Sequence, residues 1–599
     1  MLGHNGRWFI KGGLQLWTMI AGGALAIPFL FSKSTADPFL PPRFLVTAAL
    51  TLSIFVVYLI HSNFHRRVTP CGSSADGTLV WLLVNLLISA VSLSGALNFG
   101  AGIYAWLNLF LFYAFCIGAR LTLGNDFRRT QSLIKAIVLS AIPFAMIGWP
   151  ALLVPDLSAG SIFGSVSGTM GNRNLYASAM FLFLPFVLFA VLCYRGWWFK
   201  MGFLGLILLF SGIWVTGARS VWVAILFSGG VVIFSTRIGR SGLVRRRFPS
   251  TALEKHLHTG SRPMLRSIFP FRSAMISIGV VMSIGIAILA PGQPDGKTSI
   301  PGLLSADSLN QRILLWTATI RMVGHSPLMG VGPGQWKLQF PNYGPMNPVL
   351  QEDGIQYEIV FQRPHNDYLL VLAEHGILGL VCMILFYGLL IRQCYRIIKN
   401  GRDLSEQKLG VCMLFGLIGY MVIACFSFPG ERIFHNVFLG FITATILSSH
   451  DRLETGHDRQ QAVSELWVTR WHYLSLIGLL TVCVWVGWSR CASDVHTSSA
   501  LQAMSAGDDA NAIAHLRLAE TWLYTLDPTS TPLAFYRALA HHRLGQEDQA
   551  RRQFVRACND HPNHLHALVN AARYQLMGGN RFAAEVYSMR ARRLSASSR

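Results

Sequence analysis

Long apolar runs alternate with short polar loops along most of the chain. Runs of about 17 to 23 residues are long enough to cross ~30 Å of hydrocarbon as helices. Such runs lie near residues 14–31, 43–61, 78–96, 98–118, 133–154, 175–193, 199–216, 219–236, 273–290, 369–391, 408–427, 432–449 and 471–488. The pattern predicts an all-α polytopic membrane protein of about 12–13 transmembrane helices, the first of them retained rather than cleaved as a signal peptide.

Composition and charge agree with this class. The 599 residues are 52% hydrophobic and only 13% charged, with a formal net charge of +22. The Lys and Arg residues gather in alternate loops, most densely in 237–272, which predicts a cytoplasmic N-terminus by the positive-inside rule. The high net charge therefore reflects topology and contact with anionic membrane lipids, and no nucleic-acid partner is expected.

Two regions are expected outside the membrane, both on the exported side. The first is the loop 291–367, and the second is the tail after residue 491. In the tail, equivalent residues recur 34 apart: Pro528 and Pro562, Gly545 and Gly579, Ala550 and Ala584. This period resembles tetratricopeptide repeats, which usually dock partner proteins, although a passive helical cap is the alternative.

These features divide the chain into four expected parts. They are N-terminal membrane helices (1–160), a membrane core with the exported loop (161–450), a cytoplasmic linker with the last span (451–490) and the helical-repeat tail (491–599). The ten cysteines are scattered and none has the spacing of a metal site, so neither a metal nor another cofactor is expected.

Two arginines on the exported side are candidate ligands for an anionic substrate. Arg219 lies in a tight turn between two spans, where cations are otherwise rare. Arg312 lies on a predicted amphipathic helix over 307–324, one turn before Trp316, whereas Arg321 faces the other side of that helix. A guanidinium group matches phosphate oxygens in pairs, although snorkelling to lipid headgroups would also account for Arg219.

The segment 363–369, Arg-Pro-His-Asn-Asp-Tyr-Leu, places His365 where the exported loop re-enters the membrane. Ionisable groups at such a boundary indicate a site, although an interfacial anchor is the alternative. The preceding Gly330-Val331-Gly332-Pro333-Gly334 is expected to form a turn rather than a nucleotide cradle. Glu374 lies half a helical turn out of phase with His365, and two roles stay open for it: pairing with an exported arginine such as Arg219, or a buried hydrogen bond.

Together these segments resemble the O-antigen ligase and polymerase family of bacterial envelopes, over about residues 160 to 450. The segments that carry the resemblance are Gly171–Asn174, Thr216–Ser220, Gln311–Trp316, His325–Pro327 with the glycine turn, and His365–Leu369 with Glu374, Gly376 and Gly379. One departure is Arg173, at a position where the family more often has proline.

The resemblance implies a GT-C-like, metal-independent glycosyltransferase at the periplasmic face of the bacterial inner membrane. Its donor would be an undecaprenyl-diphosphate-linked glycan, and its acceptor another glycan, the lipid A core or a protein. Carried over to this sequence, Arg219 and Arg312 would hold the diphosphate, and His365 would orient or deprotonate the acceptor hydroxyl. The expected substrate-binding residues are Arg363, Arg173, Asn366, Tyr368, Glu374 and Trp316.

Ligase, polymerase and protein glycosylation are not separated by these motifs. A transporter of inorganic carbon or another small solute is the main alternative, but a carrier is expected to place its polar residues in broken helices at mid-bilayer. A scaffold whose tail recruits partners while the membrane part is inert is a third possibility.

Overall fold

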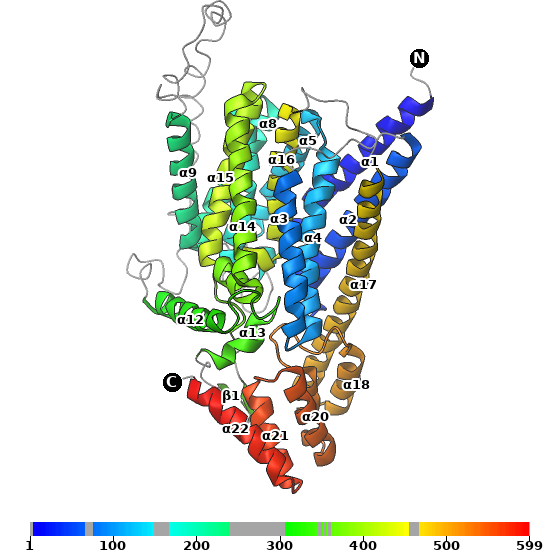
Figure 1. The fold of residues 1–599 in the computed structure, drawn as a ribbon, viewed down its shortest axis with the longest axis vertical. Coiled ribbons are helices and arrows are strands. Elements are labelled where there is room, and N and C mark those ends of the chain that lie inside the picture. The colour runs from blue at the N-terminus through cyan, green and yellow to red at the C-terminus, as the bar shows by residue number, and fades with distance from the viewer. Residues whose placement is uncertain are drawn as a thin grey trace, which may run out of the picture.

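The chain is described here by a computed structural model that covers residues 4–65, 76–148, 167–238, 306–344, 350–352, 355–357, 361–454 and 466–597. A bundle of long helices carries a smaller group of helices, the tail, at one end (Figure 1). The predicted span 273–290 and most of the basic loop 237–272 lie outside the described residues.

The bundle confirms the predicted all-α polytopic membrane protein. Its helices are α1 (His4–Ala26), α2 (Leu40–His65), α3 (Asp76–Ser92), α4 (Phe99–Leu123), α5 (Phe127–Met146), α7 (Arg173–Cys193), α8 (Trp197–Thr216), α9 (Arg219–Ile238), α14 (Asp367–Asn400), α15 (Leu404–Phe426), α16 (Ile433–Glu454) and α17 (Leu466–Ser505). Each predicted span in the described ranges coincides with one of these helices. Nine helices in those ranges are long and apolar enough to cross a membrane.

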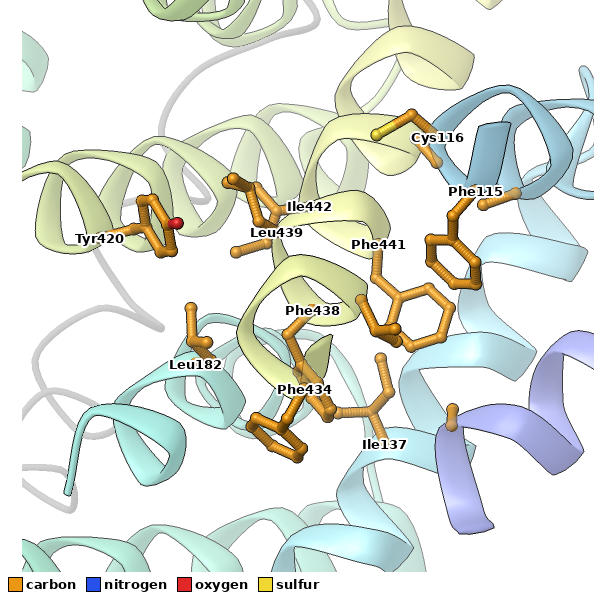
Figure 2. Packing of buried hydrophobic residues seen from close by; sticks show 14 of the residues in the cluster. Phe115, Cys116, Ile137, Leu182, Tyr420, Phe434, Phe438, Leu439, Phe441 and Ile442 are labelled. Atoms are coloured by element: carbon orange, nitrogen blue, oxygen red, sulfur yellow. The ribbon is translucent and has the colours of Figure 1, made fainter. Parts of the chain in front are cut away.

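Helix α16 forms the centre of the bundle and packs against α4, α14 and α15. Its Phe434 and Phe438 rings stack with centroids 4.6 Å apart, and Phe441 meets Phe115 of α4 (Figure 2). Although α16 is the least hydrophobic of the nine spans, the apolar part of it that could cross the membrane is entirely buried. Because it contacts protein rather than lipid, it tolerates polar residues such as His435, whose ring lies 2.8 Å from the Ser178 hydroxyl.

Helix α14 is broken near its start, where the glycine turn docks. Gly376 has φ 68° and ψ −171°. Around the break, the Val331 N–H donates to Ala373 O at 2.8 Å and the Ile377 N–H donates to Pro327 O at 2.9 Å. The predicted turn is confirmed, since Gly330, Gly332 and Gly334 all have positive φ. The turn therefore satisfies backbone groups that the break leaves unpaired.

The elements of the long loop lie at the same end of the bundle as the tail, which we call the tail face (Figure 1). They are α12 (Ala306–His325), which confirms the predicted helix, α13 (Trp336–Gln339), and the antiparallel strands β1 (Leu350–Glu352) and β2 (Ile355–Tyr357). A small core of Leu315, Met322, Trp336 and Phe340 packs α12 and α13 against Leu370 and Ala373 of α14. Short 3-10 turns are η1 (Ile27–Phe29), η2 (Leu93–Gly95), η4 (Gly168–Met170), η7 (Phe340–Asn342) and η8 (Pro429–Glu431).

Helix α17 joins the bundle to the tail without interruption. Its 40 residues span about 60 Å at 1.5 Å per residue, twice the hydrocarbon thickness. It packs on α2 in the bundle and on α18 in the tail, so the expected boundary at residue 491 falls inside one helix.

The tail consists of short helices, each packed on the next. They are α18 (Asp509–Ala519), α19 (Leu533–Arg543), α20 (Glu547–Asp560), α21 (Leu565–Met577) and α22 (Arg581–Ser597). Gly545 and Gly579, which are 34 residues apart, both take left-handed φ values at the turns between helices. This arrangement agrees with helical hairpins, and the assignment to tetratricopeptide repeats stays a prediction.

Candidate functional site

The segment before α14 holds His365 in a constrained conformation. His365 has φ 56°, a value that residues other than glycine rarely adopt. On one side of it, the Pro364 carbonyl accepts a hydrogen bond from Trp316 Nε1 at 2.9 Å. On the other side, the Asn366 side chain caps α14 by accepting from the Leu369 N–H at 3.0 Å. Backbone strain of this kind is often kept at functional sites.

The structure brings the three predicted catalytic residues together from different elements. Arg219 begins α9 directly after the left-handed Gly217 that ends α8, and Arg312 lies half-buried on α12. Burial lowers the pKa of Arg312, and the positive charge of Arg219 lowers it further. Arg312 in turn lies close enough to His365 for its charge to lower the pKa of His365. Arg312 therefore lies within electrostatic reach of both Arg219 and His365 at the tail face.

His365 is kept neutral in this environment. Burial, followed by the charges of Arg312 and Arg363, lowers its pKa to about 4, and Glu431 opposes the shift. A neutral imidazole retains a lone pair that can accept a proton at neutral pH.

The ring of Phe428, in the link between α15 and α16, contacts His365 and two arginine side chains. Its ring centroid lies 5.2 Å from that of His365, 4.4 Å from the Arg363 guanidinium carbon and 5.3 Å from that of Arg432. Arg363 also forms an ion pair with Glu431. The ring and the carboxylate therefore fix the position of Arg363 beside His365.

The sequence reasoning missed Phe428 and Glu431. The signal that could have found them is the charged pair Glu431-Arg432, which lies in a short loop between two spans, as Arg219 does. Phe428 itself has no such signal, because an aromatic residue at the end of a span is common in membrane proteins.

The other predicted binding residues mostly organise the backbone. The Glu374 carboxylate accepts hydrogen bonds from the N–H groups of Gly334 at 2.8 Å and Trp336 at 3.0 Å, so of its two open roles the structure shows the buried hydrogen bond. The Tyr368 hydroxyl donates to Met421 O at 3.0 Å. Arg173 begins α7 with an exposed side chain, and none of the contacts found in the described residues joins it to His365.

A cavity of about 280 Å³ opens beside this cluster, between α3, α4, α14 and the tail. Arg363 lines the cavity, and its charge also lowers the pKa of His365. Arg363 therefore lies at the border between the cavity and the cluster. Lys337 lines it too, and burial and the charge of Arg363 lower the pKa of Lys337 to about 8. Asp367, which sequence reasoning did not single out although it lies in the histidine motif, accepts from the Gly430 N–H at 2.8 Å through Oδ2. Within the described residues its buried Oδ1 has no hydrogen-bond partner.

In the described ranges, no three His, Cys, Asp or Glu side chains gather closely enough to hold a metal ion. The positive charge of the cluster comes from its arginines.

The fold and the cluster define a polytopic membrane protein with a histidine–arginine site at one face. Residues 204–384 match the sequence model of the family described as O-antigen ligase, and this part of the chain belongs to that family. The match runs from α8 into α14, so it contains Arg219, Arg312 and His365. A search of curated proteins finds no match to the chain. The matched part is thus an O-antigen ligase-type domain within a multi-pass membrane protein.

Proposed function

We propose that the protein transfers a glycan from undecaprenyl diphosphate to an acceptor hydroxyl at the periplasmic face of the bacterial inner membrane. The observation that carries this proposal is the convergence of Arg219, Arg312 and His365 at the tail face. The family match supports a ligase or polymerase type of transfer, and a neutral imidazole next to guanidinium groups suits a general base beside a diphosphate.

In the proposed step, the acceptor oxygen attacks the anomeric carbon of the donor sugar. A new carbon–oxygen bond forms while the bond from the anomeric carbon to the diphosphate oxygen breaks, and that oxygen keeps the electron pair. The acceptor proton passes to the His365 imidazole. Undecaprenyl diphosphate leaves with one more negative charge, which Arg219 and Arg312 neutralise. One displacement of this kind inverts the anomeric centre.

Donor binding would also tune the base. The charges of Arg312 and Arg363 lower the pKa of His365. A bound diphosphate offsets those charges, and the pKa of His365 then rises toward its ordinary value. The imidazole would become a stronger base only once the donor is in place, which limits proton transfer to the loaded enzyme.

Charged residues at the end of the bundle opposite the tail support an orientation in the membrane. At the end opposite the tail, Arg120 pairs with Asp451 at 2.9 Å and Arg452 pairs with Glu406 at 2.9 Å. Basic residues mark the cytoplasmic side of membrane proteins, so we infer that the tail face is periplasmic. Lipid-linked glycan is available to the cluster on that side.

The test is reconstitution of the full chain with a defined undecaprenyl-diphosphate oligosaccharide and candidate acceptors, followed by product size. A single addition indicates a ligase, a growing ladder indicates a polymerase, and glycosylated polypeptide indicates protein transfer. We expect His365→Ala and Arg312→Ala to slow transfer by at least about 100-fold. Arg321→Ala is the matched control, since Arg321 is exposed on the same helix as Arg312. Normal transfer by both site variants, with membrane levels equal to wild type, would contradict the proposal.

One observation bears on the transporter alternative: the break of α14 at Gly376, since carriers use discontinuous helices. Here the glycine turn fills the break with backbone hydrogen bonds. Solute uptake by vesicles that contain the full chain would favour the transporter if it persisted in His365→Ala while glycan transfer was absent from wild type.

A further inference from the structure

The tail supplies one wall of the cavity beside His365. Leu523 and the residues from Thr525 to Pro528 line the cavity opposite α3, α4 and α14. They belong to the non-helical segment between α18 and α19, which we call the tail loop (residues 520–532). The family match ends at residue 384, so this wall is a feature of the present chain beyond the matched region.

The tail loop has a defined shape of its own. Isolated bridges pair Thr521 with Tyr524 and Leu526 with Pro532. At its centre, the Asp527 carboxylate accepts hydrogen bonds from the Thr529 hydroxyl at 2.7 Å, the Thr531 N–H at 2.8 Å and the Tyr536 hydroxyl at 2.9 Å. A buried carboxylate with this many donors fixes the loop, so the loop forms a firm wall.

The same loop is fastened to the membrane core beside the catalytic segment. Gln362, three residues before His365, donates through Nε2 to Thr529 O at 2.6 Å and accepts from the Ser530 hydroxyl at 2.9 Å. Asn98, which caps α4, donates to Thr525 Oγ1 at 2.8 Å. A methyl group on Gly100 would lie only 2.8 Å from Trp522 O, so tail and core are in direct backbone contact there. The loop and His365 are therefore held in a fixed spatial relation.

The lining of the cavity suits a sugar. Amide groups of Asn85, Asn98 and Asn108 stand among the rings of Trp81 and Tyr104. In the described part of the chain, two buried oxygens of lining residues have no hydrogen-bond partner: Asp367 Oδ1 and Tyr104 Oη. Buried polar atoms left without partners call for a ligand or water. A glycan offers many hydroxyl donors and acceptors on a compact ring frame, which matches amides, a carboxylate and a phenol set among aromatic rings.

We propose that this cavity binds the acceptor glycan, and that the tail loop determines which glycans fit. The inference rests on the proposed transfer function and deepens it. The acceptor sugar would reach His365 from the cavity, past Arg363, while the donor diphosphate lies on Arg219 and Arg312. The tail would then be part of the substrate site, in addition to any partner that it binds.

A binding experiment tests this without relying on transfer. The probe is a fluorescently labelled, lipid-free oligosaccharide released from the surface polysaccharide of the producing cells, titrated by anisotropy against the full chain in lipid nanodiscs. Pro528→Trp places a large ring at the cavity wall, and we expect the dissociation constant to rise at least about tenfold. Leu518→Trp is the matched control, because Leu518 is 64% exposed and does not line the cavity.

Tyr104→Phe is a second test that still applies if Pro528→Trp fails to fold. It keeps the ring and removes only the hydroxyl, which has no partner in the described part of the chain. We expect about threefold to tenfold weaker binding with unchanged or higher thermal stability. Unchanged binding in Pro528→Trp and Tyr104→Phe, or no binding by wild type, would overturn the inference. Arg312→Ala separates the two proposals, since it should retain oligosaccharide binding and lose transfer. If it keeps transfer while Pro528→Trp weakens binding, the proposed chemistry fails and the glycan cavity stands.

Discussion

Trp316 and Pro364 are joined by a hydrogen bond of 2.9 Å from the indole Nε1–H to the carbonyl oxygen. This bond ties α12, which carries Arg312 one turn earlier, to the residue before His365. A single helix therefore sets the position of the arginine and, through the indole, that of the histidine. In this way a long loop can hold two proposed catalytic groups, which lie far apart in the sequence, in a fixed spatial relation.

Loss of this bond should slow turnover without unfolding the protein. Trp316→Phe keeps an aromatic ring but removes the donor, at a cost of about 1 kcal/mol in local positioning. We expect kcat in the reconstituted transfer assay to fall about fivefold, with little change in the KM for donor. Trp485→Phe, at a side chain 54% exposed on α17, is the control. Equal kcat values in both variants would show that the indole N–H has no positioning role.

Transfer should persist well into the acid range. The pKa of His365 in the free enzyme is about 4, so the imidazole stays neutral at neutral pH and gains a proton only near that value. We expect kcat/KM for donor to be level from about pH 8 to about 5 and to fall below that. Arg363→Gln removes a cation that lowers the pKa of His365, and it also frees Glu431, whose charge raises that pKa. The fall of kcat/KM at acid pH should therefore begin at a higher pH in this variant. Arg321→Gln should leave the fall unmoved. A fall that stays in place in Arg363→Gln would show that His365 is not the titrating base.

The break in α14 should be intolerant of any side chain. At Gly376, with φ 68°, an added Cβ would lie 2.1 Å from Leu328 O. We expect Gly376→Ala to displace the glycine turn and to lower the melting temperature by several degrees, with loss of transfer. Gly388→Ala, in the same helix, meets no atom within 4 Å and should melt like wild type or slightly higher. Similar melting of the two variants would contradict the tight docking of the turn.

Acid should loosen the tail before the membrane bundle. His561 and His564 are buried in the tail. Burial lowers the pKa of His561 to about 3, with Lys337 adding to the effect, and burial also lowers the pKa of His564 well below its ordinary value. Because the unfolded tail binds protons below about pH 6.5 and the folded tail does not, stability falls as pH drops from about 6.5 toward 3. The loss at pH 5 is about 2 kcal/mol for His561.

Hydrogen exchange measures this effect locally. Amides of α20 and α21 should exchange faster at pH 5 than at pH 7 after correction for intrinsic rates, whereas those of α16 should not. A His561→Phe variant should lose part of the pH dependence, and a substitution at the exposed His325 should not alter it. Equal protection of the tail at both pH values would contradict the expectation.

The membrane spans were predictable because the hydrocarbon thickness imposes a length on every apolar run. The positions of Arg219, Arg312 and His365 followed from motifs whose spacing identifies the family. The indole bond of Trp316 and the amide bonds of Glu374 were not predictable, because nothing local distinguishes a side chain that binds backbone from one that binds substrate. The contacts of Phe428 are known only once α15 and α16 are packed.

The contact between tail and core had no local signature either. Gln362 and Thr529 are 167 residues apart and meet only because α17 delivers the tail to the catalytic segment. The repeat period predicted helices in the tail but gave no information on where they dock. Long-range placement of this kind depends on the whole set of helix packings.

The uninterrupted α17 also limits how this enzyme can evolve. Each residue inserted into that helix would swing the tail by about 100° around its axis and lift it by about 1.5 Å. Only insertions close to whole turns would return the tail loop to the side of Gln362, and even those would raise it off the bilayer surface. A tail taken from a related protein would therefore fit this core only if α17 kept its length. We expect the sequences of the tail and the membrane core to change together.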